Sequence, residues 1–311
     1  MSIFETLISV IAAIAVFLYA LEGFSRELQK VGGETLQDWL CKVTANRWAG
    51  FGVGALATAI LQSSTAVSTL TTTLVNASVI SFRASLGMLL GASVGKTSTV
   101  WLVSLQLTAI GPFFIALGAL VSLLPKRFGF FGRSLFYFGM IFAALDLISR
   151  AVMPLRELPA VMELMAQASS PLVGVLAGAF ITLVVQSSTV TTGLAILLVQ
   201  QGMLPPQAAI AIAFGANAGT TSTALLASMG MSTIAKKTAR YNFFFKTTGV
   251  IVFFPLIVPL SNFLNQHIDD TGQVVAAAHL IFNLTMSLIF MLMLNPIVNF
   301  AEKKPLPAVT P

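Results

Sequence analysis

The chain has 311 residues, of which 56% are hydrophobic and only 9% are charged, and its mean hydropathy is +0.90. Soluble domains carry about 25% charged residues, so this composition excludes a soluble enzyme and a disordered chain. It also argues against an outer-membrane barrel, whose strands alternate apolar and polar residues. The sequence therefore predicts an all-α polytopic membrane protein. The net charge of +6 is expected in cytoplasmic loops rather than on a nucleic-acid-binding face.

The first predicted element is a membrane helix over residues 6–21. The N-terminus before it lacks the basic stretch of a cleavable signal peptide, so this helix is expected to remain in the protein. Residues 22–48 carry charged residues among apolar ones at helical spacing. This pattern predicts an interfacial helix or hairpin, with a turn at Gly32 and Gly33. The apolar stretch 50–61 follows, and at about 12 residues it is too short to cross a hydrocarbon core of roughly 30 Å.

This short stretch runs into the polar residues 62–65, after which a Thr-rich apolar segment continues to Ile80. A second apolar run, 86–101, is interrupted by a segment with two glycines and a lysine at 91–97. Residues 109–124 are predicted to form a further span, which a basic loop closes. After that loop the pattern of the first half begins again.

The second half of the chain repeats the first at an offset of 124 residues. The register holds without a gap across roughly 80 residues, and it holds at Gln, Ser, Arg and Gly positions, where apolar sequence rarely matches itself by chance. Two repeats, each with a short apolar segment broken by polar residues, are typical of secondary transporters. We therefore expect two inverted structural repeats, with a site between them near the membrane midplane.

A basic cluster over residues 236–246 follows the second repeat, and segments 250–260 and 280–294 are the centres of two further predicted spans. The excess of Lys and Arg places this cluster, the loop near Lys126 and the C-terminus among the expected cytoplasmic parts. The predicted organisation in chain order is a first membrane helix (1–21), repeat 1 (22–108), a connecting membrane segment with a basic loop (109–140), repeat 2 (141–232), C-terminal membrane helices (233–300) and a short tail (301–311).

The two Gln-Ser-Ser-Thr runs carry the chemistry that the sequence predicts. Polar side chains and unwound backbone cannot stay unpaired in hydrocarbon. A single run could serve helix packing, but two runs in equivalent places favour a binding site. Hydroxyl and amide groups can donate to phosphate oxygens, and their oxygens, with free backbone carbonyls, can coordinate the hard cation Na⁺. This inventory fits a mixed site for an oxyanion and sodium, and helix N-termini at such breaks also attract anions.

These motifs resemble those of the sodium–phosphate cotransporter family, the type II or PNaS group. The duplicated QSS motif of that family is similar to residues 62–65 and 186–189, its GANxGTT motif to residues 215–221, and its late H-x-x-F-N segment to residues 279–283. The resemblance covers nearly the whole chain. It implies two inverted repeats, each with a re-entrant (broken) helical hairpin that carries one QSS run, and a site for phosphate and Na⁺ between the hairpins. Many bacterial members carry a PhoU-like C-terminal domain, which this chain is expected to lack.

The candidate site therefore comprises both QSS runs and the motif that follows each run. The first repeat departs from the family pattern, because Ser93 stands where the second repeat has Asn217, and Lys96 stands where it has Thr220. Sodium coordination in the first half is therefore expected to be incomplete. The predicted site residues are Gln62, Ser63, Ser64, Thr65, Ser93, Lys96 and Thr97 in the first repeat, and Gln186, Ser187, Ser188, Thr189, Asn217, Thr220 and Thr221 in the second.

Lys96 is an ionisable residue inside an apolar segment, which makes it a functional candidate by default. Its ammonium could stand in for one Na⁺, could attract the anion directly, or could snorkel to the interface or pair with Asp146 or Glu22. Glu22 and Asp146 are equivalent in the two repeats, as are Arg26 and Arg150, and we interpret them as ion pairs at the membrane boundary. The late polar residues Asn242, Lys246, His279 and Asn283 are predicted to serve packing.

The leading prediction is a secondary active transporter of inorganic phosphate coupled to Na⁺, with several spans in the cell inner (cytoplasmic) membrane. The alternatives are transport or export of another anion on the same fold, or a weakly coupled anion channel. An enzyme is not predicted, because no acid–base pair or metal cluster recurs in the buried segments and Cys41 is the only cysteine. The expected partners are phosphate, Na⁺ as the coupling ion and the lipid bilayer, with no cofactor and no nucleic acid, and with a homodimer as one candidate assembly.

Overall fold

The computed structural model describes residues 3–42, 46–105, 107–158, 163 and 170–303. All regular secondary structure in these residues is helical, which confirms the all-α class. Six helical segments in them are long and apolar enough to cross a bilayer, as expected of a multi-pass membrane protein. These segments are Phe4–Lys30, Phe82–Ser104, Gly129–Leu155, Pro206–Ser228, Thr233–Asn265 and Thr271–Ala301.

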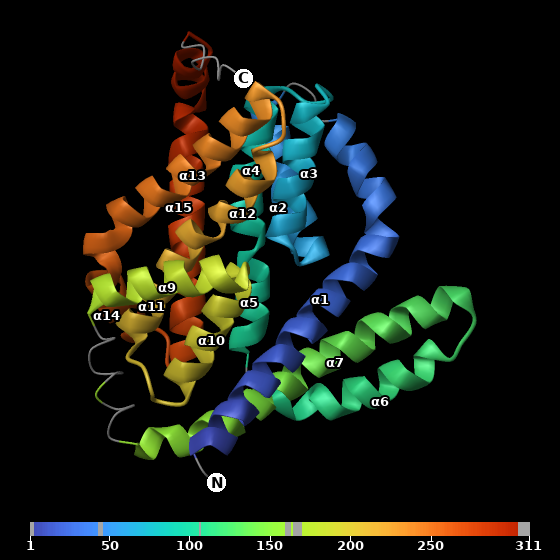
Figure 1. Ribbon diagram of the computed structural model, residues 1–311, viewed down its shortest axis with the longest axis vertical. Coiled ribbons are helices and arrows are strands. Elements are labelled where there is room, and N and C mark those ends of the chain that lie inside the picture. Colours follow the sequence, from blue (N-terminus) through green and yellow to red (C-terminus); the bar gives the residue numbers. More distant parts are fainter. Residues whose placement is uncertain (1–2, 43–45, 106, 159–162, 164–169, 304–311) are drawn as a thin grey trace.

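The chain begins with one long helix, α1 (Ile3–Lys42), which runs obliquely past the rest of the molecule (Figure 1). The predicted first helix ends at residue 21, yet α1 continues through the charged stretch and through Gly32 and Gly33. The predicted turn there, and the hairpin alternative, are therefore wrong. The stretch contains no proline and keeps its apolar residues at helical spacing, and a glycine costs a helix only about 1 kcal/mol. Nothing in this segment forces the chain to turn.

Helices α6 (Gly111–Ser122) and α7 (Lys126–Val152) form an arm beside α1 (Figure 1). A short 3-10 helix, η1 (Leu107–Ile110), precedes α6. Together η1 and α6 are shorter than the roughly 20 residues that a span requires, so the predicted span over 109–124 is not among the six candidates. The residues that were expected to form a basic loop lie instead in the first turns of α7.

A buried carboxylate holds this arm against α1. Glu27 of α1 is only 4% exposed, and it accepts hydrogen bonds from Lys30 Nζ at 2.5 Å and from Arg133 Nε of α7 at 2.9 Å. A buried charge is tolerated when opposite charges and hydrogen bonds compensate its desolvation, as they do here. Arg133 therefore joins two helices that are distant in the sequence.

Four helices of the first half recur with identical lengths in the second. In the first half they are α2 (Arg47–Leu61), α3 (Ser64–Asn76), α4 (Phe82–Gly95) and α5 (Thr97–Ser104), and in the second they are α9 (Pro171–Val185), α10 (Ser188–Gln200), α11 (Pro206–Gly219) and α12 (Thr221–Ser228). The bounds of corresponding helices differ by 124 residues throughout, which is the offset found in the sequence. The repeat is thus present in local structure as well as in sequence.

Glycines let the first and third helices of each repeat pack with their backbones in contact. A Cβ added to Gly54 of α2 would lie 2.2 Å from a backbone carbonyl oxygen of α4, and one added to Gly91 of α4 would lie 1.9 Å from a carbonyl oxygen of α2. In the second repeat, Gly178 and Gly215 are equally constrained, at 2.1 and 1.9 Å. Small residues commonly allow such close approach between membrane helices, so these contacts fix α2 against α4 and α9 against α11.

Three helices close the described chain: α13 (Thr233–Phe253), α14 (Ile257–Asn265) and α15 (Thr271–Lys303). The 3-10 helix η3 (Phe254–Leu256) joins α13 to α14, and η2 (Met153–Glu157) follows α7. Helix α15 runs along the long axis of the molecule and packs against α4, α5, α10 and α11, so it contacts both repeats (Figure 1). The predicted tail lies outside the described residues from position 304 onward.

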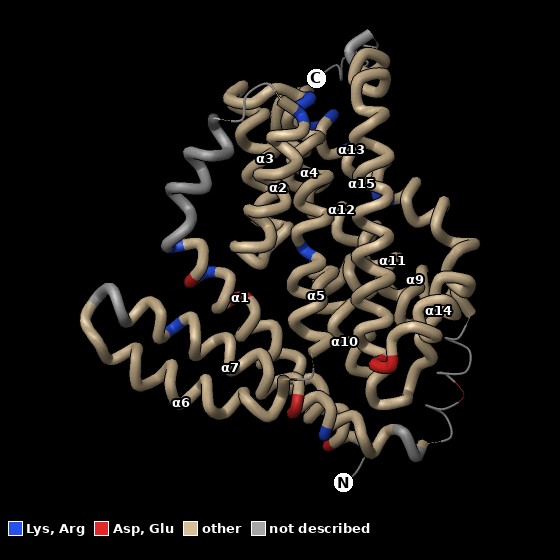
Figure 2. Tube along the Cα trace, turned by 180° about the vertical axis from the view of Figure 1, so that it is seen from behind, with Lys and Arg blue, Asp and Glu red and all other residues tan. Residues whose placement is uncertain are grey.

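Charged residues are sparse along the helices, and basic residues gather at the end of the molecule where the C-terminus lies (Figure 2). Helix α13 contributes to this basic end. The Lys237 ammonium donates to the Ala301 carbonyl oxygen near the end of α15, and it lies 5.7 Å from the centre of the Phe82 ring at the start of α4. The predicted basic cluster is therefore part of a helix that begins at this end.

Candidate functional site

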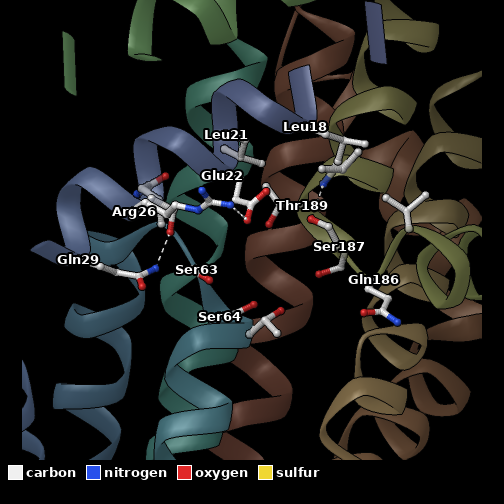
Figure 3. A pocket seen from close by; sticks show the side chains of 16 residues that line it. Leu18, Leu21, Glu22, Arg26, Gln29, Ser63, Ser64, Gln186, Ser187 and Thr189 are labelled. Atoms are coloured by element: carbon white, nitrogen blue, oxygen red, sulfur yellow. Dashed lines mark hydrogen bonds and ion pairs between the residues drawn. The ribbon is translucent and has the colours of Figure 1, made fainter. Parts of the chain in front are cut away.

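A cavity of about 650 Å³ lies between the two repeats, and α1 crosses it (Figure 3). Its lining consists of residues 62–65 at the junction of α2 and α3, residues 185–190 at the junction of α9 and α10, and residues of α1 between Leu18 and Gln29. Figure 3 shows Ser63 and Ser64 on one side of the cavity and Ser187 on the other. The tertiary structure therefore brings the two Gln-Ser-Ser-Thr runs together, and all eight of their residues line the cavity.

Each run breaks a helical pair in the same way. Gln62 and Gln186 cap the C-termini of α2 and α9 with φ of 53° and 58°, in the left-handed region that residues other than glycine rarely adopt. Ser63 and Ser187 are the N-caps of α3 and α10, and their hydroxyl oxygens accept a backbone N–H three residues later, at 3.2 and 3.4 Å. Strained backbone of this kind persists mainly where a functional site requires it.

The two breaks present backbone groups of both signs to the cavity. The first turns of α3 and α10 carry N–H groups without a partner in their own helix and the positive ends of the helix dipoles, whereas the last turns of α2 and α9 carry carbonyls that the helix ladder leaves open. One of these carbonyls, that of Leu61, accepts from Ser25 Oγ of α1 at 2.8 Å. Because anions are favoured at helix N-termini and small hard cations at carbonyl oxygens, the cavity has the chemistry to hold both.

The Gln62 side chain is only partly satisfied. Its Nε2 donates to the Ala59 carbonyl oxygen and to Ser98 Oγ, the latter at 3.2 Å, while its Oε1 is buried without a hydrogen-bond partner. Leaving a buried acceptor unpaired costs about 1–3 kcal/mol, so such atoms are rare in folded proteins. Gln62 therefore brings an unsatisfied amide oxygen to the wall of the cavity.

The motif that follows each QSS run lies outside the lining of this cavity. Ser93, Thr97, Thr220 and Thr221 are buried, and each hydroxyl donates to a carbonyl oxygen of its own helical segment, at 3.0, 2.7, 2.9 and 2.6 Å respectively. These hydroxyls are therefore satisfied locally, as buried helical Ser and Thr often are. Ser93, Lys96, Thr97, Asn217, Thr220 and Thr221 are therefore buried residues that do not line the cavity.

Among these six residues, Lys96 connects the first repeat to the second. It is 2% exposed, and its ammonium donates to Ser188 Oγ at 3.3 Å and to Asn217 Oδ1. The alternative in which Lys96 pairs with Glu22 or Asp146 is wrong, because its partners are neutral oxygens of the second repeat.

The carboxylates of both repeats pair instead with arginines one helical turn away. Glu22 binds Arg26 at 2.5 Å and Asp146 binds Arg150 at 2.8 Å, which confirms the predicted ion pairs. The sequence interpretation missed that the first pair lines the cavity whereas the second lies outside the lining. The missed signal is a polar stripe on α1, in which Glu22, Ser25, Arg26 and Gln29 follow each other at helical spacing.

In the described part of the chain, no three His, Cys, Asp or Glu side chains gather into a metal-binding cluster. The oxygens that could hold a cation at the cavity are therefore the Glu22 carboxylate, the Gln62 amide oxygen, hydroxyls and backbone carbonyls. The groups that could hold an anion are the N-termini of α3 and α10, the serine hydroxyls and the Arg26 guanidinium.

Comparison with known proteins supports the resemblance to sodium–phosphate cotransporters. The sequence profile of the Na⁺/Pi-cotransporter family matches residues 16–150 and 157–292. An uncharacterised protein of Bacillus subtilis (strain 168), YqeW, is 27% identical over 292 residues, which cover 93% of this chain and 95% of that protein. No solved structure is significantly similar to the chain.

Two further relatives carry functional names. A Salmonella typhimurium protein, provisionally named inorganic phosphate export protein YjbB, is 27% identical over 286 residues, or 91% of this chain and 53% of that protein. Sodium-dependent phosphate transport protein 2B of Bos taurus is 37% identical over 86 residues, or 26% of this chain and 12% of that protein. The chain thus spans about half the length of the export relative and a short part of the bovine one.

Proposed function

Because the chain belongs to the Na⁺/Pi-cotransporter family, we propose that it moves inorganic phosphate across the membrane through the cavity between its repeats, in a step coupled to Na⁺. One observation carries the proposal: both Gln-Ser-Ser-Thr breaks line a single cavity together with a guanidinium and a carboxylate. The breaks occur in equivalent places in the two halves, as is typical of transporters whose central site lies between two repeats.

Phosphate would bind between the N-termini of α3 and α10. Their free N–H groups and the hydroxyls of Ser64 and Ser188 offer donors from two sides, and Arg26 offers a fork of donors that matches an oxyanion. Arg26 is paired with Glu22, so an incoming phosphate competes with that carboxylate for the guanidinium.

This competition supplies a reason for coupling to Na⁺. When phosphate draws Arg26 away, the Glu22 carboxylate loses its partner, and a Na⁺ beside it restores the charge balance. The unpaired Gln62 Oε1 and the carbonyls at the end of α2 are further oxygen ligands nearby. Binding of each ion thereby frees a charged side chain to bind the other ion, so the two ions bind with positive cooperativity.

The fold that we propose for this function has two inverted repeats with re-entrant hairpins. The pairs α2–α3 and α9–α10 consist of helices with 15 and 13 residues. At 1.5 Å per residue these helices are about 20–22 Å long, less than a hydrocarbon core of roughly 30 Å. Each pair would therefore enter the inner membrane and turn back at its QSS run.

The test is transport of radiolabelled phosphate into proteoliposomes, with gradients of Na⁺, K⁺ and pH imposed in turn. We expect an inward Na⁺ gradient to drive accumulation of phosphate and a K⁺ gradient of equal size to leave it at equilibrium. Equal rates under both cations would contradict the coupling, and a lack of phosphate flux under every gradient would contradict phosphate transport itself.

Export is a second candidate, which the name of the Salmonella relative supports. Intact cells that make the protein distinguish the two directions, because the chain has one orientation and the natural ion gradients there. Cells preloaded with radiolabelled phosphate lose it faster than cells without the protein if it is an exporter, and they accumulate external phosphate faster if it is an importer.

A further inference from the structure

Lys96 places a buried positive charge where the first repeat contacts the second. It is 2% exposed and lies at the turn between α4 and α5, where its equivalent in the second repeat is Thr220. The ammonium donates to Ser188 Oγ at 3.3 Å and to Asn217 Oδ1. None of the ion pairs among the described residues includes Lys96, so its ammonium is stabilised by hydrogen bonds to neutral oxygen atoms alone.

The oxygens around Lys96 are of the kind that also bind Na⁺. Asn217 turns its amide oxygen toward the ammonium, because its Nδ2 donates to Asn283 Oδ1 at 3.1 Å and Asn283 Nδ2 donates in turn to the His279 carbonyl oxygen at 2.7 Å. Amide, hydroxyl and carbonyl oxygens are ligands of hard cations. A buried charge without a counter-ion costs several kcal/mol, which argues against a purely structural role.

Ser188 connects this charge to the cavity. Its Oγ accepts from Lys96, so its own hydroxyl proton is free to be donated to an anion, and Ser188 lines the cavity. Lys96 lies outside that lining, so it acts on a bound phosphate through Ser188 rather than by contact. The position suits a cation that accompanies the anion better than an anion-binding residue.

The equivalent position in the second repeat carries a hydroxyl. Thr220 donates to the Ala216 carbonyl oxygen of its own helix at 2.9 Å. With Thr65 and Thr69 it lines a separate cavity of about 10 Å³, to which Lys246 of α13 also contributes. The same break thus has an ammonium in one repeat and a neutral oxygen in the other.

We propose that the Lys96 ammonium occupies the place of one coupling cation between the repeats, so that the protein moves phosphate with one Na⁺ fewer than a variant with threonine at position 96. The inference rests on the proposed phosphate transport and specifies how many mobile cations accompany it. A threonine at position 96 offers its hydroxyl oxygen, together with Asn217 Oδ1 and Ser188 Oγ, to a mobile Na⁺.

Phosphate uptake by the purified protein in proteoliposomes tests this stoichiometry. The variant is Lys96→Thr, and the matched control is Lys236→Thr, which makes the same change at the basic start of α13. We expect initial uptake to depend more steeply on Na⁺ concentration in Lys96→Thr, by one additional Na⁺ per phosphate, whereas Lys236→Thr keeps the wild-type dependence. A Lys96→Thr protein that transports phosphate with the wild-type Na⁺ dependence overturns the proposal.

Thermal unfolding in detergent tests the same site without transport. Sodium chloride, compared with choline chloride, should raise the unfolding temperature of Lys96→Thr more than that of the wild type, because only the variant has a vacant cation site at this position. An equal effect on both proteins overturns the proposal even if the variant is inactive. A wild-type protein that moves no phosphate would overturn the proposed function, and the difference in Na⁺ stabilisation would still be measurable.

Discussion

Gln62 and Gln186 occupy the same position in the two helix breaks, and both line the cavity. An amide side chain can donate to phosphate and accept from or coordinate a cation, whereas alanine can do neither. We expect Gln62→Ala and Gln186→Ala each to abolish phosphate uptake while the protein remains folded, with comparable losses because the positions are equivalent. Radiolabelled uptake, together with the unfolding temperature, measures both parts of this prediction.

Gln201→Ala is the matched control for the two glutamine variants. Gln201 caps the other end of α10, where its Nε2 donates to Ser149 Oγ at 3.1 Å, outside the cavity lining. It should transport phosphate at the wild-type rate. Wild-type uptake in either Gln62→Ala or Gln186→Ala would refute the assignment of that residue to the site.

The ion pair of Glu22 and Arg26 allows a direct test of coupling, because the repeat supplies an equivalent pair, Asp146 and Arg150, away from the cavity. Coupling between two ligands typically amounts to about 5–150-fold in affinity. We expect Na⁺ to tighten phosphate binding by at least about fivefold in the wild type and by clearly less in Glu22→Gln. Asp146→Asn is the control and should show the same Na⁺ enhancement as the wild type. Calorimetric titration with phosphate, in the presence and absence of Na⁺, would measure the enhancement in the wild type and in both variants. Equal Na⁺ enhancement in Glu22→Gln and the wild type would remove Glu22 from the coupling.

At the scale of helices, the close contact between α2 and α4 depends on positions where a Cβ has no room. A Cβ at Gly91 would lie 1.9 Å from a carbonyl oxygen of α2, whereas a Cβ at Gly52 of α2 meets nothing within 4 Å. We therefore expect the same substitution to have opposite effects. Gly91→Ala should destabilise the protein by about 1–3 kcal/mol because the helices must separate, and Gly52→Ala should stabilise it by about 0.5–1 kcal/mol through helix propensity.

Unfolding temperatures of the two glycine variants, measured in the same detergent, check the expected signs. Gly215→Ala tests the repeat, because a Cβ there would also lie 1.9 Å from a carbonyl oxygen. It should lose stability to a similar extent as Gly91→Ala. A Gly91→Ala protein as stable as the wild type would mean that the backbones of α2 and α4 are not in contact at Gly91.

At the scale of the whole molecule, α15 determines which ends lie on opposite sides of the membrane. Its 33 residues extend about 50 Å, which exceeds a hydrocarbon core of roughly 30 Å. Asp269 lies just before the start of α15. The basic start of α13 lies beside the last turns of α15, because Lys237 donates to the Ala301 carbonyl oxygen. Because loops rich in Lys and Arg stay in the cytoplasm, we expect the basic end to face inward.

Single cysteines in a Cys41→Ser background test this orientation. A membrane-impermeant maleimide should label Asp269→Cys in intact spheroplasts and should label Lys236→Cys only after the membrane is permeabilised. Labelling of the two positions in the reverse order would invert the orientation, and labelling of both from outside would contradict the assignment of α15 as a span.

The sequence by itself determined the helical membrane class, the offset of 124 residues between the repeats and the positions of both helix breaks. These features depend on hydropathy and on capping residues within a few positions of each other, such as Ser63 and Ser187, so local sequence is sufficient to predict them. The resemblance to sodium–phosphate cotransporters rested on the same motifs, and the family match bears it out.

Only the tertiary structure decided which side chains meet. That Glu22 and Arg26 line the cavity while Asp146 and Arg150 do not, that Arg133 binds Glu27, and that Lys96 reaches Ser188 and Asn217 all depend on how distant helices pack. Local spacing shows that a helix has a polar face, but it does not show which other helix that face meets. The backbone contacts at the glycines hold α2 against α4 and α9 against α11 within each repeat, whereas the partners of Lys96 depend on how the two repeats meet.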